Sequence, residues 1–254
     1  MQVIIKKQGL RYFLEFAYKG TNYHGWQYQP NAITVQETLN TALSIILKSK
    51  IDLVGAGRTD TGVHAKQMFA HFDFENNIEI EALIFKANSF LPKDIAIINL
   101  HLVHDDAHAR FDATERTYHY YIHQKKNAFE ANDSWFFQQK MNIERMNEAG
   151  KLLLNHTDFE CFSKVNTDVN TFNCCIKEAY WTQTMDGLIF TITADRFLRN
   201  MVRAIVGTMV NIGTQKINLS DFEMILKSND RSKAGFSAPA HGLYLTAVKY
   251  PYLP

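Results

Sequence analysis

Hydrophobic positions in the first hundred residues follow two periods, one of two residues and one of three to four. Alternation of apolar and polar side chains is typical of half-buried strands, whereas the longer spacing is typical of amphipathic helices. Thr34 and Glu37 form a capping-box pattern, which predicts that a helix begins just after Thr34. In chain order we expect a strand over 10–17, a helix over 35–47, strands over 51–54 and 67–74, a helix over 80–87 and a strand over 95–103.

The same order of elements recurs in the second half of the chain, without literal repetition of the sequence. Asp186-Gly187 is a strong hairpin signal between two of the expected strands, and Ser220 with Glu223 predicts the cap of a short extra helix. In chain order we expect a strand over 114–123, a helix over 143–153, strands over 174–184 and 188–194, a helix over 197–210, the short helix and a strand over 242–250.

Strand, helix, strand, strand, helix, strand is the ferredoxin-like order. We therefore predict an α+β fold of two ferredoxin-like (βαββαβ) halves, residues 1–105 and 106–254, with antiparallel sheets that form one continuous central sheet. The polar stretch from His104 to His108 marks the boundary. No low-complexity tract or flexible linker separates the halves, so we expect them to pack together.

Composition narrows the class of protein further. No run of about eighteen apolar residues occurs, which argues against a membrane span, and residues 1–9 lack a signal-peptide pattern. Three cysteines, two of them adjacent, argue against a disulfide framework and favour a reducing, cytoplasmic setting. The formal net charge is only +1, so a surface for nucleic acid must come from local clustering of basic residues.

The segment from Gly55 to Ala65 places one carboxylate, Asp60, in a glycine-rich loop between two apolar runs. Glycine loses more backbone entropy on folding than any other residue, so such a loop indicates close backbone approach or unusual dihedral angles. Arg58 lies two residues before Asp60, where a cation can keep the carboxylate ionised. An ionised, positioned carboxylate can serve as a nucleophile or a base. The alternative is an ordinary turn aspartate, because Asp-Thr-Gly is good turn chemistry.

Asp-Thr-Gly is also the tripeptide of aspartic proteases. Their chemistry needs two carboxylates that share a proton, and this chain has a single Asp-Thr-Gly. Those proteases are also all-β proteins, whereas here the tripeptide lies inside a mixed pattern of helices and strands. Both observations argue strongly against a protease.

Three arginines, Arg196, Arg199 and Arg203, recur at three- and four-residue spacing, which predicts that they share one face at the start of a helix. One interpretation is a solvated, salt-bridged face. The other is a site for phosphate or carboxylate groups, which arginine forks and helix N-termini both favour.

The expected strand from Arg116 to Tyr121 interleaves aromatic and basic side chains. Aromatic rings on a sheet can stack on bases, although alternate tyrosines can equally pack in a core with their hydroxyl groups satisfied. His104 and His108 have the spacing of two metal ligands on a helix, but no third ligand follows, which favours ordinary surface histidines. Cys174 and Cys175 lack zinc-finger spacing, and we expect them in a buried strand.

Taken together, these segments resemble the TruA family of tRNA pseudouridine synthases over almost the whole chain. The glycine loop is the most specific of them. The matching segments are Tyr18 to Pro30, Thr34-Val35-Gln36, Gly55 to Ala65, His108-Ala109-Arg110-Phe111, Arg116-Thr117-Tyr118, Phe197 to Arg203 and Ala238 to Leu245. Ala107 departs from the family pattern, which more often has an aromatic residue there.

The resemblance implies an isomerase that converts uridine to pseudouridine in the anticodon stem-loop, at tRNA positions 38, 39 and 40. Such an enzyme breaks the C1′–N1 glycosidic bond, rotates the uracil and rejoins it through C5. The reaction is a net isomerisation, so no metal or cofactor is expected. The target base must leave its stack to react, and we expect the fold to form a catalytic cleft that receives it.

The resemblance also implies roles for individual residues. Asp60 is the catalytic aspartate, and it remains open whether it attacks C1′ as a nucleophile or removes a sugar proton as a base. Tyr118 lies against the flipped uracil and assists proton removal from C5, while Arg203 pairs with Asp60. The expected substrate contacts are Arg58, which helps to extrude the base or fills the place that it leaves, Leu243 or Leu245 as the apolar wall of the pocket, and Arg196 and Arg199.

Family members are homodimers, which implies a homodimer whose RNA contacts both subunits. The competing hypothesis is a non-catalytic RNA-binding module built on the tyrosine-rich strand and the arginine helix. A carboxylate close to phosphates is unfavourable for simple RNA affinity. Asp60 therefore favours the enzyme.

Overall fold

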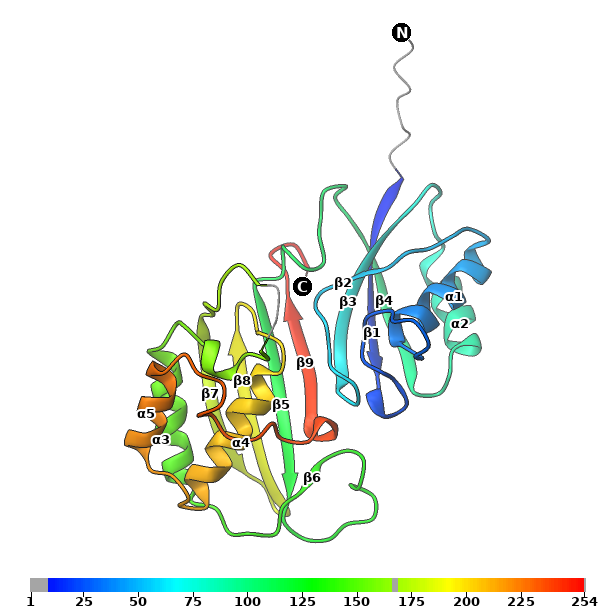
Figure 1. Cartoon of the computed structure of the whole chain (residues 1–254). Helices are drawn as coiled ribbons and strands as arrows, with labels where there is room; N and C mark the ends of the chain where they lie inside the picture. The colour runs from blue at the N-terminus through cyan, green and yellow to red at the C-terminus, as the bar shows by residue number, and fades with distance from the viewer. Residues whose placement is uncertain (1–8, 166–168, 254) are drawn as a thin grey trace.

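One continuous sheet runs through the computed structural model, which describes residues 9–165 and 169–253 (Figure 1). Residues 1–8, which contain most of the segment that lacks a signal-peptide pattern, lie outside the described part. Nine strands and five α-helices make up this described α+β structure, and most neighbouring strands are antiparallel. None of its helices is long and apolar enough to cross a membrane.

In the N-terminal half, three long strands lie side by side with β1 in the middle. Thr34 caps the first helix, because its Oγ1 accepts a hydrogen bond of 3.3 Å from the Glu37 amide. The elements are β1 (Leu10–Tyr18), α1 (Val35–Leu47), β2 (Val54–Gly55), β3 (His64–Phe74), α2 (Ile80–Phe90) and β4 (Ile95–Val103).

The strand expected over 51–54 is largely wrong, because only Val54 and Gly55 pair with β3. Side chains of α1 take up the backbone groups that a neighbouring strand would otherwise bind. Ser44 accepts from the Ile51 amide at 2.9 Å and Asn40 accepts from the Leu53 amide at 3.1 Å. Ile51 and Leu53 are buried, whereas Asp52 and Val54 are exposed, and the segment is held by a helix rather than by a sheet.

The part of the chain that follows β4 contributes the remaining strands and helices. Its helices α3 and α5 begin with capping residues, and the cap of α5 is Asn218 with Asp221 rather than the predicted Ser220 with Glu223. The elements are β5 (Glu115–His123), β6 (Trp135–Phe136), α3 (Ile143–Leu154), β7 (Ile176–Gln183), β8 (Gly187–Ala194), α4 (Met201–Gly213), α5 (Leu219–Lys227) and β9 (Leu243–Lys249).

Two expectations for this half are wrong in detail. The strand expected from Cys174 begins at Ile176, and Cys175 is exposed while Cys174 is buried. Helix α4 begins at Met201 and not at Phe197, because Asn200 adopts a left-handed conformation with φ of 66°. Arg196 and Arg199 therefore precede the helix and do not share a helical face with Arg203.

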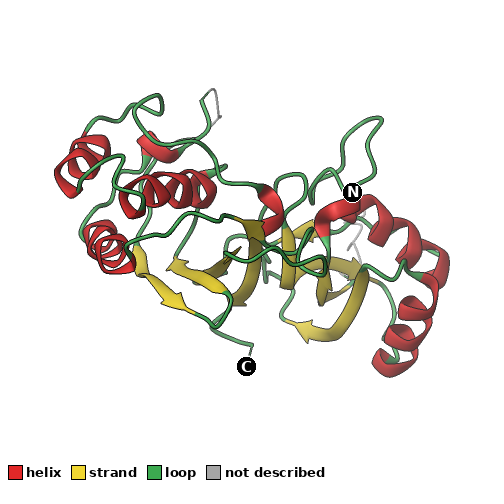
Figure 2. Cartoon of the chain, turned by 90° about the horizontal axis from the view of Figure 1, so that it is seen from below, coloured by secondary structure: helices red, strands yellow, loops and turns green. Residues whose placement is uncertain are grey.

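The two halves are joined in the sheet by the parallel pairing of β3 with β9, where His64 lies opposite Tyr244 and Ala65 opposite Leu245. The full strand order is β4-β1-β3-β9-β5-β8-β7. In Figure 2 the helices of the two halves lie at opposite ends of the molecule, and strands fill the middle where the halves meet.

Buried residues form two hydrophobic cores, one in each half, and each core receives residues from the other half. Val63, at the end of the glycine loop, packs in the C-terminal core. Leu245, Val248 and Tyr250 pack in the N-terminal core. This exchange fastens the halves together at the glycine loop and at β9.

Candidate active site

Asp60 lies in the loop between β2 and β3, beside the strand pairing that joins the halves. Gly62 has a φ of 77°, a conformation that glycine adopts without strain, and the Val63 amide donates to the Asp60 carbonyl at 3.1 Å. Just before Asp60, the hydroxyl groups of Thr59 and Tyr18 share a hydrogen bond of 2.8 Å. The loop is therefore held on both sides of Asp60.

Two arginines face the Asp60 carboxylate. Arg203 Nη1 lies 3.4 Å from Asp60 Oδ2, and Arg199 Nε lies 3.9 Å from Oδ1. Arg203 is itself fixed, because its Nε donates to the Ala238 carbonyl at 2.7 Å. The Asp60 side chain is 27% exposed, so the pair is open to a ligand and not sealed in the core.

Arg58 does not pair with Asp60, which corrects the expectation drawn from their spacing. Across residues 9–165 and 169–253, the exposed Arg58 forms neither a hydrogen bond nor an ion pair. Arg196 is half-buried and makes no ion pair with Asp60. The structure thus brings Arg199 and Arg203 to the carboxylate and leaves Arg58 free for another partner.

Tyr118 comes to the site from the C-terminal half, on β5. Burial raises the pKa of its hydroxyl to about 12, the Arg116 guanidinium opposes that shift, and the Asp60 carboxylate adds to it. The ring packs edge-on against Phe197, with 5.1 Å between ring centroids. Tyr118 is thus a protonated phenol under the influence of the Asp60 charge.

The two leucines expected at the pocket wall occupy different places on β9. Leu245 lies directly opposite Tyr118 in the sheet and belongs to the N-terminal core. Leu243 lies opposite Tyr120 and belongs to the C-terminal core. Leu245 is therefore the apolar neighbour of Tyr118, and Leu243 lies two pairs further along the two strands.

Tyr120 and Tyr121 lie away from the carboxylate. Tyr120 is fully buried, and its hydroxyl donates to the Pro239 carbonyl at 2.8 Å. Tyr121 faces the other side of the sheet, where Lys66 donates to its hydroxyl at 2.9 Å. Along this strand Tyr118 therefore lies at the site, Tyr120 in the core and Tyr121 on the opposite face of the sheet.

Arg116 has a part that the sequence pattern did not reveal. Its guanidinium donates to four backbone carbonyls, those of Ala56, Arg110, Ala113 and Asp195, at 2.7 to 3.0 Å. Burial lowers its pKa. Arg116 is a brace that ties the start of the glycine loop to the C-terminal half, and its guanidinium is engaged with protein groups.

His64 is a second brace that the sequence reasoning missed. It is fully buried, its Nδ1 accepts from the Gly20 amide at 3.0 Å, and its Nε2 lies 3.2 Å from the His241 carbonyl. Because Nδ1 accepts, the proton resides on Nε2, and the neutral ring links the two halves. Burial lowers the pKa of His64, which favours this neutral form. Its place directly after the loop, in Gly62-Val63-His64, was the only signal in the sequence.

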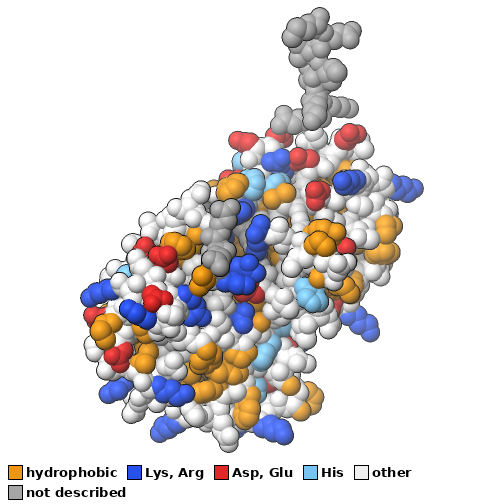
Figure 3. All heavy atoms as spheres, viewed as in Figure 1, with side chains coloured by type: hydrophobic (Ala, Val, Ile, Leu, Met, Phe, Trp, Pro, Cys, Tyr) orange, Lys and Arg blue, Asp and Glu red, His pale blue; other side chains and the backbone are white. Residues whose placement is uncertain are grey.

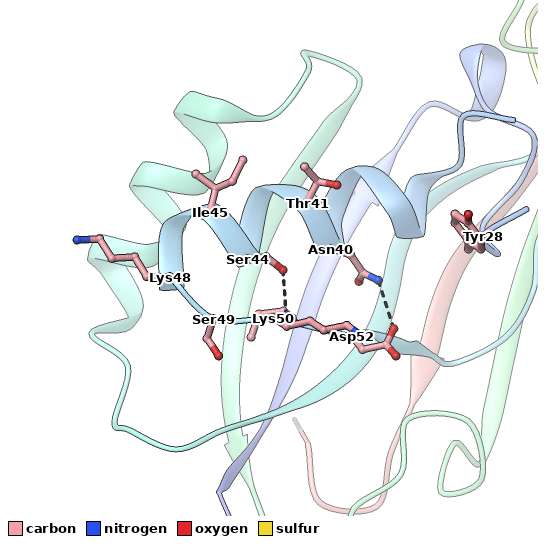
Figure 4. Close-up of a pocket in the computed structure, with 10 residues that line it drawn as sticks. Tyr28, Asn40, Thr41, Ser44, Ile45, Lys48, Ser49, Lys50 and Asp52 are labelled. Carbon is pink, nitrogen blue, oxygen red and sulfur yellow. Dashed lines mark hydrogen bonds between the residues drawn. The ribbon is translucent and has the colours of Figure 1, made fainter. Parts of the chain in front are cut away.

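Basic side chains gather along the middle of the molecular face in Figure 3, between the two halves. The groove in Figure 4 lies elsewhere, on the outer side of α1, where Asn40 and Ser44 bind the segment that leads to β2. It contains none of the residues around Asp60.

Among the described residues, no three His, Cys, Asp or Glu side chains are placed to hold a metal ion, and the stretch from His104 to His108 is a turn rather than a helix.

Comparison with known proteins identifies the family of this chain. A family model described as tRNA pseudouridine synthase matches residues 16–112 and 149–251. The chain is 52% identical over 246 residues to tRNA pseudouridine synthase A of Porphyromonas gingivalis, covering 95% of this chain and 97% of that protein. It is 49% identical over 242 residues to the protein of that name from Parabacteroides distasonis, with 95% and 96% covered. For the Bacillus subtilis protein of the same name, identity is 40% over 238 residues, with 92% and 96% covered. The chain therefore belongs to the tRNA pseudouridine synthase family.

Proposed function

We propose that this protein converts uridine to pseudouridine in the anticodon stem-loop of tRNA, at tRNA positions 38, 39 and 40. The observation that carries the proposal is the partly exposed Asp60 carboxylate, oriented by Arg203 and facing Tyr118 from the other half. RNA affinity alone gives no reason for a carboxylate at this place, because it repels phosphate groups.

In this proposal the chemistry begins when Asp60 acts on the ribose of a flipped uridine. The carboxylate either attacks C1′ and displaces N1, or removes a sugar proton so that the glycosidic bond breaks. The freed uracil then rotates, and its C5 bonds to C1′. In the first route this bond displaces the Asp60 carboxylate from C1′, and in the second the sugar regains its proton from Asp60. C5 then loses its proton and N1 gains one, so the atoms of the product are those of the substrate. Arg203 stays hydrogen-bonded to Ala238, so it holds the carboxylate in one orientation at no further ordering cost.

We assign the remaining residues to holding the base and the backbone. Leu245 and Tyr118 lie together in the sheet and form a dry wall for the uracil, which retains the detached base. Arg58 is exposed and unpaired within the described chain, as a side chain that fills the place of the flipped base must be. Arg196 and Arg199 bind phosphate groups beside it, and Leu243 supports the wall from two residues before Leu245 on β9.

Release of tritium from C5-labelled uridine in tRNA tests this function, because C5 must lose its hydrogen. We expect the wild type to release tritium and Asp60→Asn to release none while it folds and binds tRNA normally. Asp186→Asn, an exposed carboxylate in the β7–β8 turn, is the matched control and should behave as the wild type. Normal turnover by Asp60→Asn would contradict the assignment. Tight binding without release by the wild type would point to an RNA-binding module.

We also propose that the two halves, residues 1–105 and 106–254, are ferredoxin-like units. The strand order within each supports this: β4-β1-β3, with the short β2 also on β3, parallels β9-β5-β8-β7. Limited proteolysis tests the boundary, with first cleavage expected within 104–108. First cleavage inside a strand or helix of either half would refute the division.

We further propose a cytoplasmic homodimer. Family resemblance supports the dimer, and the free cysteines Cys161, Cys174 and Cys175 suit a reducing compartment. Light scattering should give twice the mass of the chain, and a monomer at all concentrations would refute the dimer. Cell fractionation tests the location, and recovery outside the cytoplasm would refute it.

A further inference from the structure

The turn from His108 to Asp112 presents two exposed side chains, Arg110 and Phe111, and the Phe111 ring packs against the His108 ring with 4.3 Å between ring centroids. Phe111 is 74% exposed, more than every other phenylalanine of the described chain except Phe85 and Phe129. The neighbouring Arg110 is also exposed, and its guanidinium lies 5.6 Å from the centre of the Phe111 ring. The turn thus displays an aromatic face and a cation side by side.

The turn is held rigidly. The Asp112 carboxylate accepts from the His108 amide at 2.7 Å and from the Tyr252 hydroxyl at 2.8 Å. His108 Nδ1 in turn accepts from the amides of Arg110 and Phe111. Because the Asp112 carboxylate binds the His108 amide and the Tyr252 hydroxyl, its charge faces the protein. The backbone that bears Arg110 and Phe111 is therefore ordered before binding and loses little conformational freedom when a ligand binds.

The turn is also coupled to the catalytic loop. One nitrogen of Arg116, Nη2, donates to the Arg110 carbonyl at 2.7 Å and to the Ala56 carbonyl at 3.0 Å. Ala56 lies four residues before Asp60, and Arg116 lies two residues before Tyr118. The exposed pair therefore lies at the edge of the site. Arg116 binds the backbone of both the turn and the catalytic loop.

We propose that Phe111 and Arg110 form a tRNA contact beside the active site, in which the ring stacks on an unpaired base and the guanidinium pairs with a phosphate. Aromatic faces stack on any base, and arginine matches phosphate geometry. This proposal rests on the proposed function, because tRNA is the nucleic acid brought to this edge. It adds a substrate-binding element that lies outside the group around Asp60.

Binding of an anticodon stem-loop RNA to variants at Phe111 tests the stacking part. We expect Phe111→Ala and Phe111→Leu each to raise Kd and KM roughly tenfold, while kcat at saturating tRNA stays near the wild-type value. Phe111→Tyr should retain wild-type binding, because it keeps the ring. Phe85→Ala is the matched control, since Phe85 is 75% exposed on α2, which packs against the outermost strand β4. Equal binding by the Ala, Leu and Tyr variants would overturn the proposal, as would a loss in the Tyr variant equal to that in Leu.

Salt dependence tests the phosphate part. Arg110→Gln should lower the slope of log Kd against log salt by about one, the value for one phosphate contact. Arg145→Gln, an exposed arginine on α3 above the other edge of the sheet, should leave the slope unchanged. An unchanged slope in Arg110→Gln would overturn this contact. Tritium release by the wild type is a separate readout, so failure of the proposed function and failure of the Phe111–Arg110 contact give different results.

Discussion

Tyr118 keeps its phenolic proton near neutral pH, since burial and then the nearby Asp60 charge raise its pKa to about 12. A protonated phenol can donate a hydrogen bond or relay a proton, but it is not a ready-made base. In the proposed reaction Tyr118 can therefore accept the C5 proton only while its own phenolic proton passes to another acceptor.

We therefore predict that Tyr118→Phe slows the chemical step by about 100-fold or more without changing tRNA affinity. Single-turnover kinetics across pH check the reason. The wild-type rate should show no ionisation of Tyr118 below about pH 11. A rate change centred near about pH 10 that disappears in Tyr118→Phe would contradict this account.

The sequence reveals the roles of some residues at the site and not of others. Asp60 stands in a loop whose composition is itself unusual, so it could be identified locally. Arg203 could be assigned only by resemblance, because it lies 143 positions after Asp60 and nothing near either residue signals their contact. Arg116 could not be understood at all from its neighbours, since its partners are carbonyl groups in three other segments.

At the scale of elements, one buried histidine on β3, His71, contacts the turn from His108 to Asp112 and helps to hold it in place. His71 Nδ1 accepts from the Ala109 amide at 3.2 Å, and the His108 ring packs edge-on against it. Burial first, then the charges of His108 and Arg11, lower the pKa of His71 to about 4.

This lowered pKa predicts a loss of stability in acid. His71 is neutral in both states above about pH 6.5, so it adds no pH dependence there. Between about pH 6.5 and 4 the unfolded chain binds the proton and the folded chain does not, which destabilises the fold by up to about 3 kcal/mol. His71→Asn keeps an acceptor but does not titrate, so its free energy of unfolding in urea should fall less steeply over this range. Parallel curves for the two proteins would contradict the assignment.

The order of the elements could be predicted because each carries its own periodicity and caps. The errors occur where side chains or one backbone conformation override that pattern. The segment 51–53 looks like a strand but is bound by Asn40 and Ser44 of α1, and the left-handed Asn200 delays α4 until Met201.

At the scale of the whole molecule, the site exists only where the two halves meet. Asp60 and Arg58 come from one half, and Tyr118, Arg199 and Arg203 from the other. The pairing of β3 with β9 and the bonds of His64 set their relative position. No local pattern could predict that pairing, because β3 and β9 stand far apart in the chain and form a parallel contact of two residue pairs.

The most direct test of the central claim is to map pseudouridine by chemical labelling in tRNA from cells that lack this protein. We predict that pseudouridine is missing at tRNA positions 38, 39 and 40, that the wild-type protein restores it, and that Asp60→Asn does not. Unchanged pseudouridine at these positions without the protein, or its full restoration by Asp60→Asn, would contradict the account.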